Sequence, residues 1–153
     1  MINIVLYSPE IPQNTGNISR TCAVTGARLH IIKPIGFEIS DRTLKRAGLD
    51  YWDKLDVTYY ENYEDFLQQN ENAELYFFSA HGKLSYADIE YPQNVFLVFG
   101  RESVGLPREL VNENFDRSIR IPMRKTLRCL NLSNSVAIAV YEVLRQGGFD
   151  GLE

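Results

Sequence analysis

The feature that most limits the fold of this 153-residue chain is an unbroken apolar run, VFLVF at Val95–Phe99. A strand with one face in water alternates polar and apolar residues, whereas a strand without alternation is covered on both faces. Further runs typical of strands lie at Ile2–Tyr7, Arg28–Ile32, Leu55–Tyr59, Leu75–Phe78 and Ser118–Ile121. The chain therefore needs helices on both sides of a sheet.

Helical patterns alternate with these runs, at Asn17–Thr25, Asp41–Ala47, Tyr63–Gln69, Pro107–Asn112 and Leu132–Gln146. This alternation predicts an α/β fold with a mostly parallel sheet and helices on both faces, in a single domain over residues 1–153. The last helix has the clearest pattern, an apolar stripe formed by Leu132, Val136, Val140, Val143 and Leu144. Either Ser133 or Asn131 can cap its start.

Composition excludes several classes of protein. No apolar run approaches the roughly 20 residues of a membrane span, so we expect no membrane segment. The first residues have neither a basic leader nor a long apolar core, which argues against a secretory signal. Cys22 and Cys129 are far apart, and His30 and His81 have no ligand spacing. We therefore expect a cytoplasmic protein with free, buried, structural thiols and no metal.

The charge is unevenly distributed along the chain. The net charge of −4 argues against a protein that coats nucleic acid in general. However, the segment from Arg101 to Arg145 carries eight basic residues against five acidic ones. A local basic face that binds one RNA is compatible with this pattern, although solvated surface charge is the simpler explanation for any single residue.

Three loops that follow predicted strands have unusual compositions: Ser8–Gly16, Gly100–Gly105 and Pro122–Asn131. Ligands of open α/β sheets bind beyond the carboxyl ends of the strands, where such loops lie. Glycine allows close approach to a ligand and a positive φ, although the second loop could simply be a tight turn. Its sequence is not a Walker A motif, because Leu106 and Pro107 replace the lysine and hydroxyl residues.

The third loop is long for a connection in a compact domain and carries Arg124, Lys125 and Arg128 just before a helix. Basic residues at a helix start favour an anionic ligand. The first loop adds Asn14 and, on the helix after it, Arg20, which alone would be read as a surface ion-pair residue.

Together, these segments resemble a known family. IPQNTGNISR at Ile11–Arg20, LVFGRESVGLP at Leu97–Pro107 and IRIPMRKTLRCLNLSNSVAIAVYEVLRQ at Ile119–Gln146 look like the three motifs of SPOUT-class RNA 2'-O-methyltransferases, in the same order. The segment KRAGLDYW at Lys45–Trp52 narrows the resemblance to the family that methylates the wobble cytidine or uridine of leucine tRNAs. The resemblance covers the whole chain.

The resemblance implies a C-terminal trefoil knot, S-adenosylmethionine as cofactor, a tRNA substrate and a homodimer with shared sites. Neither the spacing nor the periodicity of the sequence indicates a knot. By resemblance, the cofactor contacts are Phe78, Gly100, Ile121, Met123, Cys129 and Leu130. The implied polar active-site residues are Asn14, Arg20, Glu102 and Asn131. Cys129 departs from relatives that often carry serine, and a thiol is a weak donor, so we expect only a backbone contact there.

The chemistry requires a ribose 2'-hydroxyl to be aligned and its proton removed. By resemblance, Arg20 engages this hydroxyl. A guanidinium normally stays protonated and is a poor base, so we favour a clamp on phosphate or hydroxyl that stabilises the developing alkoxide. A deprotonated Arg20 acting as the base stays open. Phosphate contacts are expected from basic residues of two segments: Arg42, Lys45, Arg46, Arg124, Lys125 and Arg128.

Dimerisation is expected to use the first and last helices, because Ile138 and Tyr141 lie outside the apolar stripe of the last helix. The alternative is that both residues face the core of their own chain. Three alternative functions also stay open: a non-catalytic RNA-binding α/β module, a flavodoxin-like enzyme acting on small nucleotides, and a SPOUT enzyme acting on another tRNA position or on ribosomal RNA.

Overall fold

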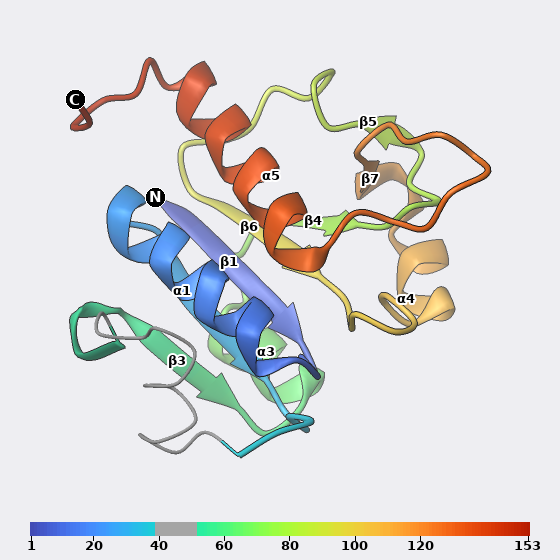
Figure 1. The fold of residues 1–153 in the computed structure, drawn as a ribbon, viewed down its shortest axis with the longest axis horizontal. Helices are drawn as coiled ribbons and strands as arrows, with labels where there is room; N and C mark the ends of the chain where they lie inside the picture. Colours follow the sequence, from blue (N-terminus) through green and yellow to red (C-terminus); the bar gives the residue numbers. More distant parts are fainter. Residues whose placement is uncertain (39–51) are drawn as a thin grey trace.

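The structure is a computed structural model, which describes residues 1–38 and 52–153. In this part of the chain, seven strands form one sheet in the order β3-β2-β1-β6-β4-β7-β5 (Figure 1). Every pair in the sheet is parallel. The strands are β1 (Ile2–Tyr7), β2 (Arg28–Ile32), β3 (Val57–Tyr60), β4 (Leu75–Phe78), β5 (Leu84–Ser85), β6 (Val95–Phe99) and β7 (Ser118–Arg120).

Helices cover both faces of this sheet, as the sequence predicts. They are α1 (Pro12–Thr25), α3 (Tyr63–Gln69), α4 (Arg108–Glu113) and α5 (Leu132–Gln146), with short 3₁₀ turns at Trp52–Lys54 and Phe115–Arg117. The helices α1 and α5 lie side by side on one face (Figure 1). The core on the other face includes residues of α3 and α4.

The apolar strand β6 lies in the middle of the sheet and is buried along its whole length. Val95, Leu97 and Phe99 belong to the core under α1 and α5. Phe96 and Val98 point to the opposite core, with Phe66 of α3. This two-sided burial explains why the VFLVF run shows no alternation and confirms the prediction made from it.

Helix α1 begins at Pro12, five residues before the start that the sequence predicts. Proline is suited to the first helical position because its missing N–H has no intrahelical partner there. The predicted loop Ser8–Gly16 is therefore wrong in its second half, which is helical. Ile18 and Cys22 of this helix are buried in the core.

Helix α5 matches its predicted range, and Asn131 is the residue that caps it. The side-chain oxygen of Asn131 accepts hydrogen bonds from the N–H of Ser133 at 2.9 Å and from its hydroxyl at 2.6 Å. Val136 and Val140 are buried, and the rest of the predicted stripe packs against the same core. This cap fixes the start of α5 at the end of the loop formed by residues 122–130.

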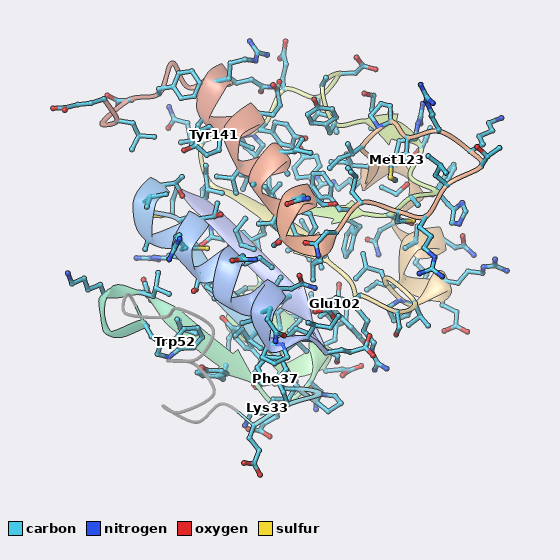
Figure 2. All side chains as sticks on the ribbon, viewed as in Figure 1. Lys33, Phe37, Trp52, Glu102, Met123 and Tyr141 are labelled. Atoms are coloured by element: carbon cyan, nitrogen blue, oxygen red, sulfur yellow. The ribbon has the colours of Figure 1, made fainter. Side chains whose placement is uncertain are left out.

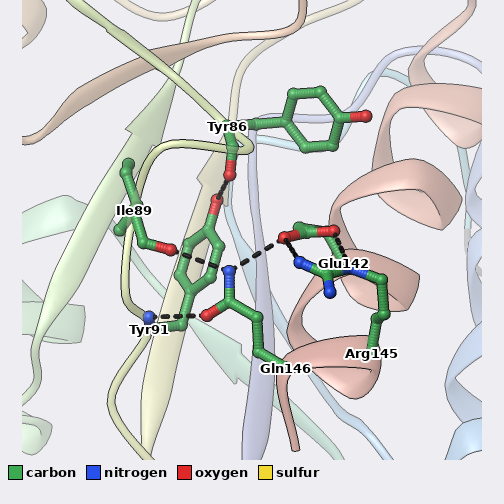
Figure 3. Close-up of polar contacts among 6 residues, drawn as sticks. All are labelled: Tyr86, Ile89, Tyr91, Glu142, Arg145 and Gln146. Atoms are coloured by element: carbon green, nitrogen blue, oxygen red, sulfur yellow. Dashed lines mark hydrogen bonds and ion pairs between the residues drawn. The ribbon is translucent and has the colours of Figure 1, made fainter.

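The far end of α5 is tied to the segment that follows β5 (Figure 3). Gln146 donates from Nε2 to the carbonyl of Ile89 at 2.7 Å, and its Oε1 accepts from the N–H of Tyr91 at 3.1 Å. The Tyr91 hydroxyl donates to the Tyr86 carbonyl at 2.8 Å. Both ends of α5 are thus fixed, one at the loop before it and one at this segment.

Smaller differences concern element boundaries. The strand predicted at Leu55–Tyr59 is β3 at Val57–Tyr60, and the helix predicted from Pro107 begins one residue later. The two-residue strand β5 had no sequence signal. The predicted helix Asp41–Ala47, its basic residues Arg42, Lys45 and Arg46, and the KRAGLDYW segment up to residue 51 lie outside the described residues. The trefoil knot stays a prediction of the resemblance.

Candidate active site

A cavity of about 1060 Å³ opens beyond the carboxyl ends of β4, β6 and β7. All strands of the sheet are parallel, so the loops that follow them meet at this edge. All the residues expected to contact a cofactor line it: Phe78, Gly100, Ile121, Met123, Cys129 and Leu130. The structure thus brings together residues from three segments that are distant in sequence.

The inner part of the cavity is apolar. Phe78, at the end of β4, stacks on Phe99, at the end of β6, with ring centroids 4.6 Å apart and planes tilted by 18°. Ile119 of β7 is fully buried beside them, and Ile121 packs against the same core. Such a surface suits a flat apolar ring rather than a charged group.

The turn after β6 is closed by its own backbone. Arg101 and Gly105 exchange both N–H to carbonyl bonds, at 3.1 and 2.8 Å. A Cβ on Gly100 would lie 2.1 Å from the backbone carbon of Gly105, so no other residue fits there. Gly105 has a φ of +71° and open space around it. Gly105 thus uses the positive φ that glycine allows, whereas Gly100 is required by the close approach of its own turn, which is the tight-turn alternative.

The loop before α5 forms the outer wall of the cavity, and its residues 122–130 are all exposed. Met123 and Leu130 contribute apolar groups, and the Leu130 N–H lies 3.3 Å from the Met123 Sδ. Arg128 lines the cavity, while Arg124 and Lys125 lie on the exposed part of the loop. A wall of exposed apolar side chains is suited to closing on a ligand.

Three of the four expected polar residues form one hydrogen-bonded chain at the rim of the cavity. Asn131 donates from Nδ2 to the Oδ1 of Asn14 at 2.9 Å. Asn14 in turn donates from Nδ2 to the Glu102 carboxylate at 3.3 Å. The same carboxylate accepts from the backbone N–H groups of Glu10 and Ile11 at 2.8 and 3.0 Å. Glu102 therefore holds the two residues that precede α1, beside the start of that helix (Figure 2), and this chain of bonds joins all three motifs.

Arg20, the fourth expected polar residue, is not among the residues that line this cavity. It lies on the exposed side of α1, six residues beyond Asn14. At 3.6 residues per turn, the two side chains leave the helix in directions about 120° apart. Within one chain, Arg20 and Asn14 therefore do not face the same space.

The two cysteines differ in their surroundings. Cys22 lies on the buried side of α1, and burial raises the pKa of its thiol to about 12. Cys129 is exposed on the loop before α5. The expectation of free thiols is confirmed, whereas the expectation that both are buried is wrong for Cys129. That residue lies on an irregular loop with no packed helix or strand to cover it.

The sequence did not indicate which residues line the cavity on the α4 side. Ser79 and His81 follow β4, and Arg108, Asn112 and Phe115 come from α4 and the turn after it. Their only sequence signal is their place after β4 and β6. Among the described residues, no cluster of three or more His, Cys, Asp or Glu side chains could hold a metal. No helix there is long and apolar enough to cross a membrane.

Comparison with known proteins finds a matching family and several similar proteins. The model of the SpoU rRNA Methylase family matches residues 1–141. A protein of Geobacillus stearothermophilus is 50% identical over 99% of this chain and 98% of its own length. The tRNA (cytidine(34)-2'-O)-methyltransferase of Saccharophagus degradans is 46% identical over 99% of both chains.

Two solved structures are similar in fold and sequence. One, from work titled "Structural insights into the 2-OH methylation of C/U34 on tRNA", has a TM-score of 0.91 and 43% identity, and the match covers 97% of both chains. The AdoMet-bound rRNA methyltransferase of Sinorhizobium meliloti has a TM-score of 0.82 and 27% identity. That match covers 94% of this chain and 56% of the neighbour.

Proposed function

Because the chain belongs to the SpoU rRNA Methylase family, we propose that it is a tRNA 2'-O-ribose methyltransferase that uses S-adenosylmethionine. Its target is the ribose 2'-hydroxyl of the nucleotide at position 34. The relative from S. degradans is named for cytidine 34, and the similar solved structure concerns C/U34. We extend the proposal to uridine as a second base, to leucine tRNAs as substrates, and to the cytoplasm as the place of action.

One observation carries this proposal: the hydrogen-bonded chain Glu102–Asn14–Asn131 borders a cavity that all six expected cofactor residues line. The three residues come from the turn after β6, the start of α1 and the start of α5. These are the segments on which the family resemblance rests. A flavodoxin-like enzyme for small nucleotides would not need this joint arrangement.

The residues present fit the proposed cofactor. The stacked Phe78 and Phe99 rings give an apolar wall suited to adenine, with Met123 and Leu130 on the outer side. Gly100 and Cys129 would contribute mainly backbone groups. When bound, S-adenosylmethionine supplies a methyl group on a positively charged sulfur. The chain itself has to bind the acceptor ribose, orient its hydroxyl and remove the proton.

The polar residues divide these tasks. Both ends of the Asn14 side-chain amide are engaged, by Glu102 and by Asn131, so Asn14 is held in one orientation. We assign these three residues to orienting the acceptor. We assign Arg20 to the 2'-hydroxyl, where its guanidinium stabilises the negative charge that develops on the ribose oxygen.

This assignment requires a homodimer, because Arg20 does not line the cavity of its own chain. Helices α1 and α5 lie side by side, and Val24 and Tyr141 on them are 57% and 49% exposed. We propose that this paired face meets a second copy, so that Arg20 of one chain reaches the cavity of the other. Ile138 is only half-buried, which is compatible with a role in the same face.

The activity is tested by incubating the protein and S-adenosylmethionine with total tRNA from a strain that lacks this enzyme. Mass spectrometry of the digested tRNA then maps the methylated nucleotide. We expect a 2'-O-methyl group at position 34 of leucine tRNAs. Methylation elsewhere in tRNA or in ribosomal RNA would favour a sister activity. A protein that binds tRNA but not S-adenosylmethionine would be a non-catalytic RNA-binding module.

The shared site is tested with two inactive variants. Arg20→Ala removes the residue assigned to the 2'-hydroxyl and leaves the cavity intact, whereas Asn131→Ala damages the cavity and keeps Arg20. If the sites are shared, mixing the two variants under conditions of subunit exchange restores activity, because one site in each mixed dimer is complete. Sedimentation at micromolar concentration gives the oligomeric state independently, and a monomer there would exclude shared sites.

A further inference from the structure

Two turns at the rim of the cavity hold each other by reciprocal hydrogen bonds. One follows β1 and includes Glu10, and the other follows β6 and includes Glu102 and Ser103. Strands β1 and β6 are neighbours, with Leu6 opposite Phe99, so the two turns lie side by side. The Glu102 carboxylate accepts from the backbone of the first turn. The Glu10 carboxylate accepts from the second turn in return.

The second half of this exchange involves Ser103. Oε1 of Glu10 accepts from the Ser103 N–H at 3.2 Å and from the Ser103 hydroxyl at 2.7 Å. These hydrogen bonds lower the pKa of Glu10 below its ordinary value. Beyond Ser103, Val104 is 73% exposed, so none of the residues that the structure describes covers the tip of this turn. The Glu10–Ser103 pair is therefore the outermost fixed point of the turn that lines the cavity.

The turn that carries Glu10 is also held by a backbone contact with Gly36. The N–H of Gly36 donates to the carbonyl of Pro9 at 2.9 Å. A Cβ on Gly36 would lie 2.9 Å from the Cα of Glu10, which shows how closely the two backbones approach. The Glu10 backbone is also fixed through its own N–H by Glu102. Glu10 is thus a rigid support, and the turn after β6 is the part that it restrains.

We propose that Glu10 is a positioning residue that, with Ser103, keeps the turn at residues 100–105 in the shape that binds the cofactor. The inference rests on the proposed function only in naming S-adenosylmethionine as the ligand of that turn. Among residues 1–38 and 52–153, removing the Glu10 carboxylate leaves Glu102 as the side chain that links this turn to the start of α1. The tip of the turn then moves more freely, and cofactor binding has to restrict that motion.

The test compares Glu10→Ala, Glu10→Gln and Ser103→Ala in the full-length protein. Glutamine keeps an oxygen that accepts both bonds, whereas alanine removes it. The matched control is Asp65→Ala, because Asp65 is half-buried like Glu10 and accepts two bonds, from the Glu61 N–H and the Gln69 side chain, at 2.9 and 2.8 Å. Asp65 lies on α3, away from the cavity. Calorimetry with S-adenosylmethionine gives the dissociation constant of each variant.

We expect Glu10→Ala to weaken cofactor binding about tenfold, which corresponds to the loss of one or two hydrogen bonds. Ser103→Ala keeps its N–H and should weaken binding about threefold, and Glu10→Gln and Asp65→Ala should change it less than twofold. Equal binding by wild type and Glu10→Ala would overturn the proposal. A Glu10→Gln variant as weak as Glu10→Ala would overturn it as well, because charge rather than position would then matter.

A second measurement does not depend on the cofactor. Amide hydrogen exchange of the peptide that covers residues 100–106 should be faster in Glu10→Ala and in Ser103→Ala than in wild type or Asp65→Ala. Ser103 is exposed, so its replacement by alanine leaves the fold intact. Unchanged exchange would overturn the positioning role. If wild type itself does not bind S-adenosylmethionine, the proposed function fails, and the exchange data still decide whether Glu10 restrains the turn.

Discussion

Asn131 donates a hydrogen bond to Asn14 across 2.9 Å, although 117 residues separate them in the chain. The bond joins the first residue before α5 to the first turn of α1. The same Asn131 side chain caps α5 through its oxygen. A single side chain therefore stabilises a helix with one atom and orders the candidate active site with another.

These two tasks can be separated by substitution. Asn131→Ala loses both and should lower the free energy of unfolding by about 1 kcal/mol while abolishing methyl transfer. Asn131→Asp keeps a capping oxygen at the positive end of the helix but cannot donate to Asn14. Its free energy of unfolding, measured in urea, should lie within about 0.5 kcal/mol of the wild-type value. The variant should still be inactive. An active Asn131→Asp enzyme would contradict a role for the bond to Asn14.

The two glycines of the turn after β6 should differ sharply in tolerance. A Cβ on Gly100 meets the backbone of Gly105 at 2.1 Å, so Gly100→Ala should cost about 3 kcal/mol of stability and remove cofactor binding. Gly105→Ala meets open space and pays only for its positive φ, about 1 kcal/mol. Urea unfolding and calorimetry measure both effects. Equal losses in the two variants would contradict this account of the turn.

Stability should fall at acidic pH because of a buried histidine. His30 contacts the Tyr60 hydroxyl at 2.8 Å and the Asn3 side-chain oxygen at 3.2 Å, and burial lowers its pKa from 6.5 to about 4. Between pH 6.5 and pH 4, the unfolded chain takes up a proton at this site that the folded chain does not. The contribution of His30 to the free energy of unfolding is therefore complete above pH 6.5, and it falls by about 3 kcal/mol by pH 4.

Urea unfolding from pH 7 to pH 4 checks the effect of His30. The variant His30→Gln should be less stable at pH 7 but should lose less stability on acidification than wild type. His81→Gln, which changes an exposed histidine, is the control and should follow the wild-type curve. Parallel curves for wild type and His30→Gln would show that another group is responsible.

The basic loop before α5 should govern the salt dependence of tRNA binding. Arg124 and Lys125 are exposed there and outside the cavity lining, which suits contacts to phosphates. Each lost contact should weaken binding and make the slope of log K against log salt shallower by about 0.7 to 0.9. Filter binding between 50 and 200 mM salt measures this for Arg124→Ala and Lys125→Ala. A binding constant that does not vary with salt would exclude phosphate contacts.

Thiol labelling should report on occupancy of the cavity. Cys129 is exposed and lines the cavity, whereas Cys22 is buried with a pKa of about 12. A maleimide should therefore modify one thiol per folded chain, found on Cys129 by mass spectrometry. Prior addition of S-adenosylhomocysteine, the demethylated product, should slow the reaction several-fold. Equal rates with and without that compound would indicate that Cys129 lies outside the binding site.

The sequence was most informative where local patterns reflect burial. The unbroken apolar run of β6 and the stripe of α5 predicted their elements correctly. The start of α1 was missed because Ile11 offers no capping side chain and the residues before the helix are held by Glu102, about ninety residues away. No rule of local spacing reports such a bond. The two-residue strand β5 was missed because it is too short to show a period.

The cavity was predictable to a similar extent. The residues expected to contact the cofactor came from the family resemblance, and the structure places all of them around one space. His81, Arg108 and Phe115 on the α4 side had no signal, because a cavity wall has no sequence period. The separation of Arg20 from Asn14 follows from helix geometry once the true start of α1 is known.

The pairing of β1 with β6 also affects how the protein is made. Ile2 lies opposite Val95. Strand β1 therefore cannot pair with β6 until more than ninety further residues have been synthesised. At 5 to 20 residues per second, this takes roughly 5 to 20 s. Asn131 leaves the ribosome later still. A nascent chain therefore exposes an unpaired apolar strand edge before it can hold any ligand, and chaperones that cover such edges would act during that interval.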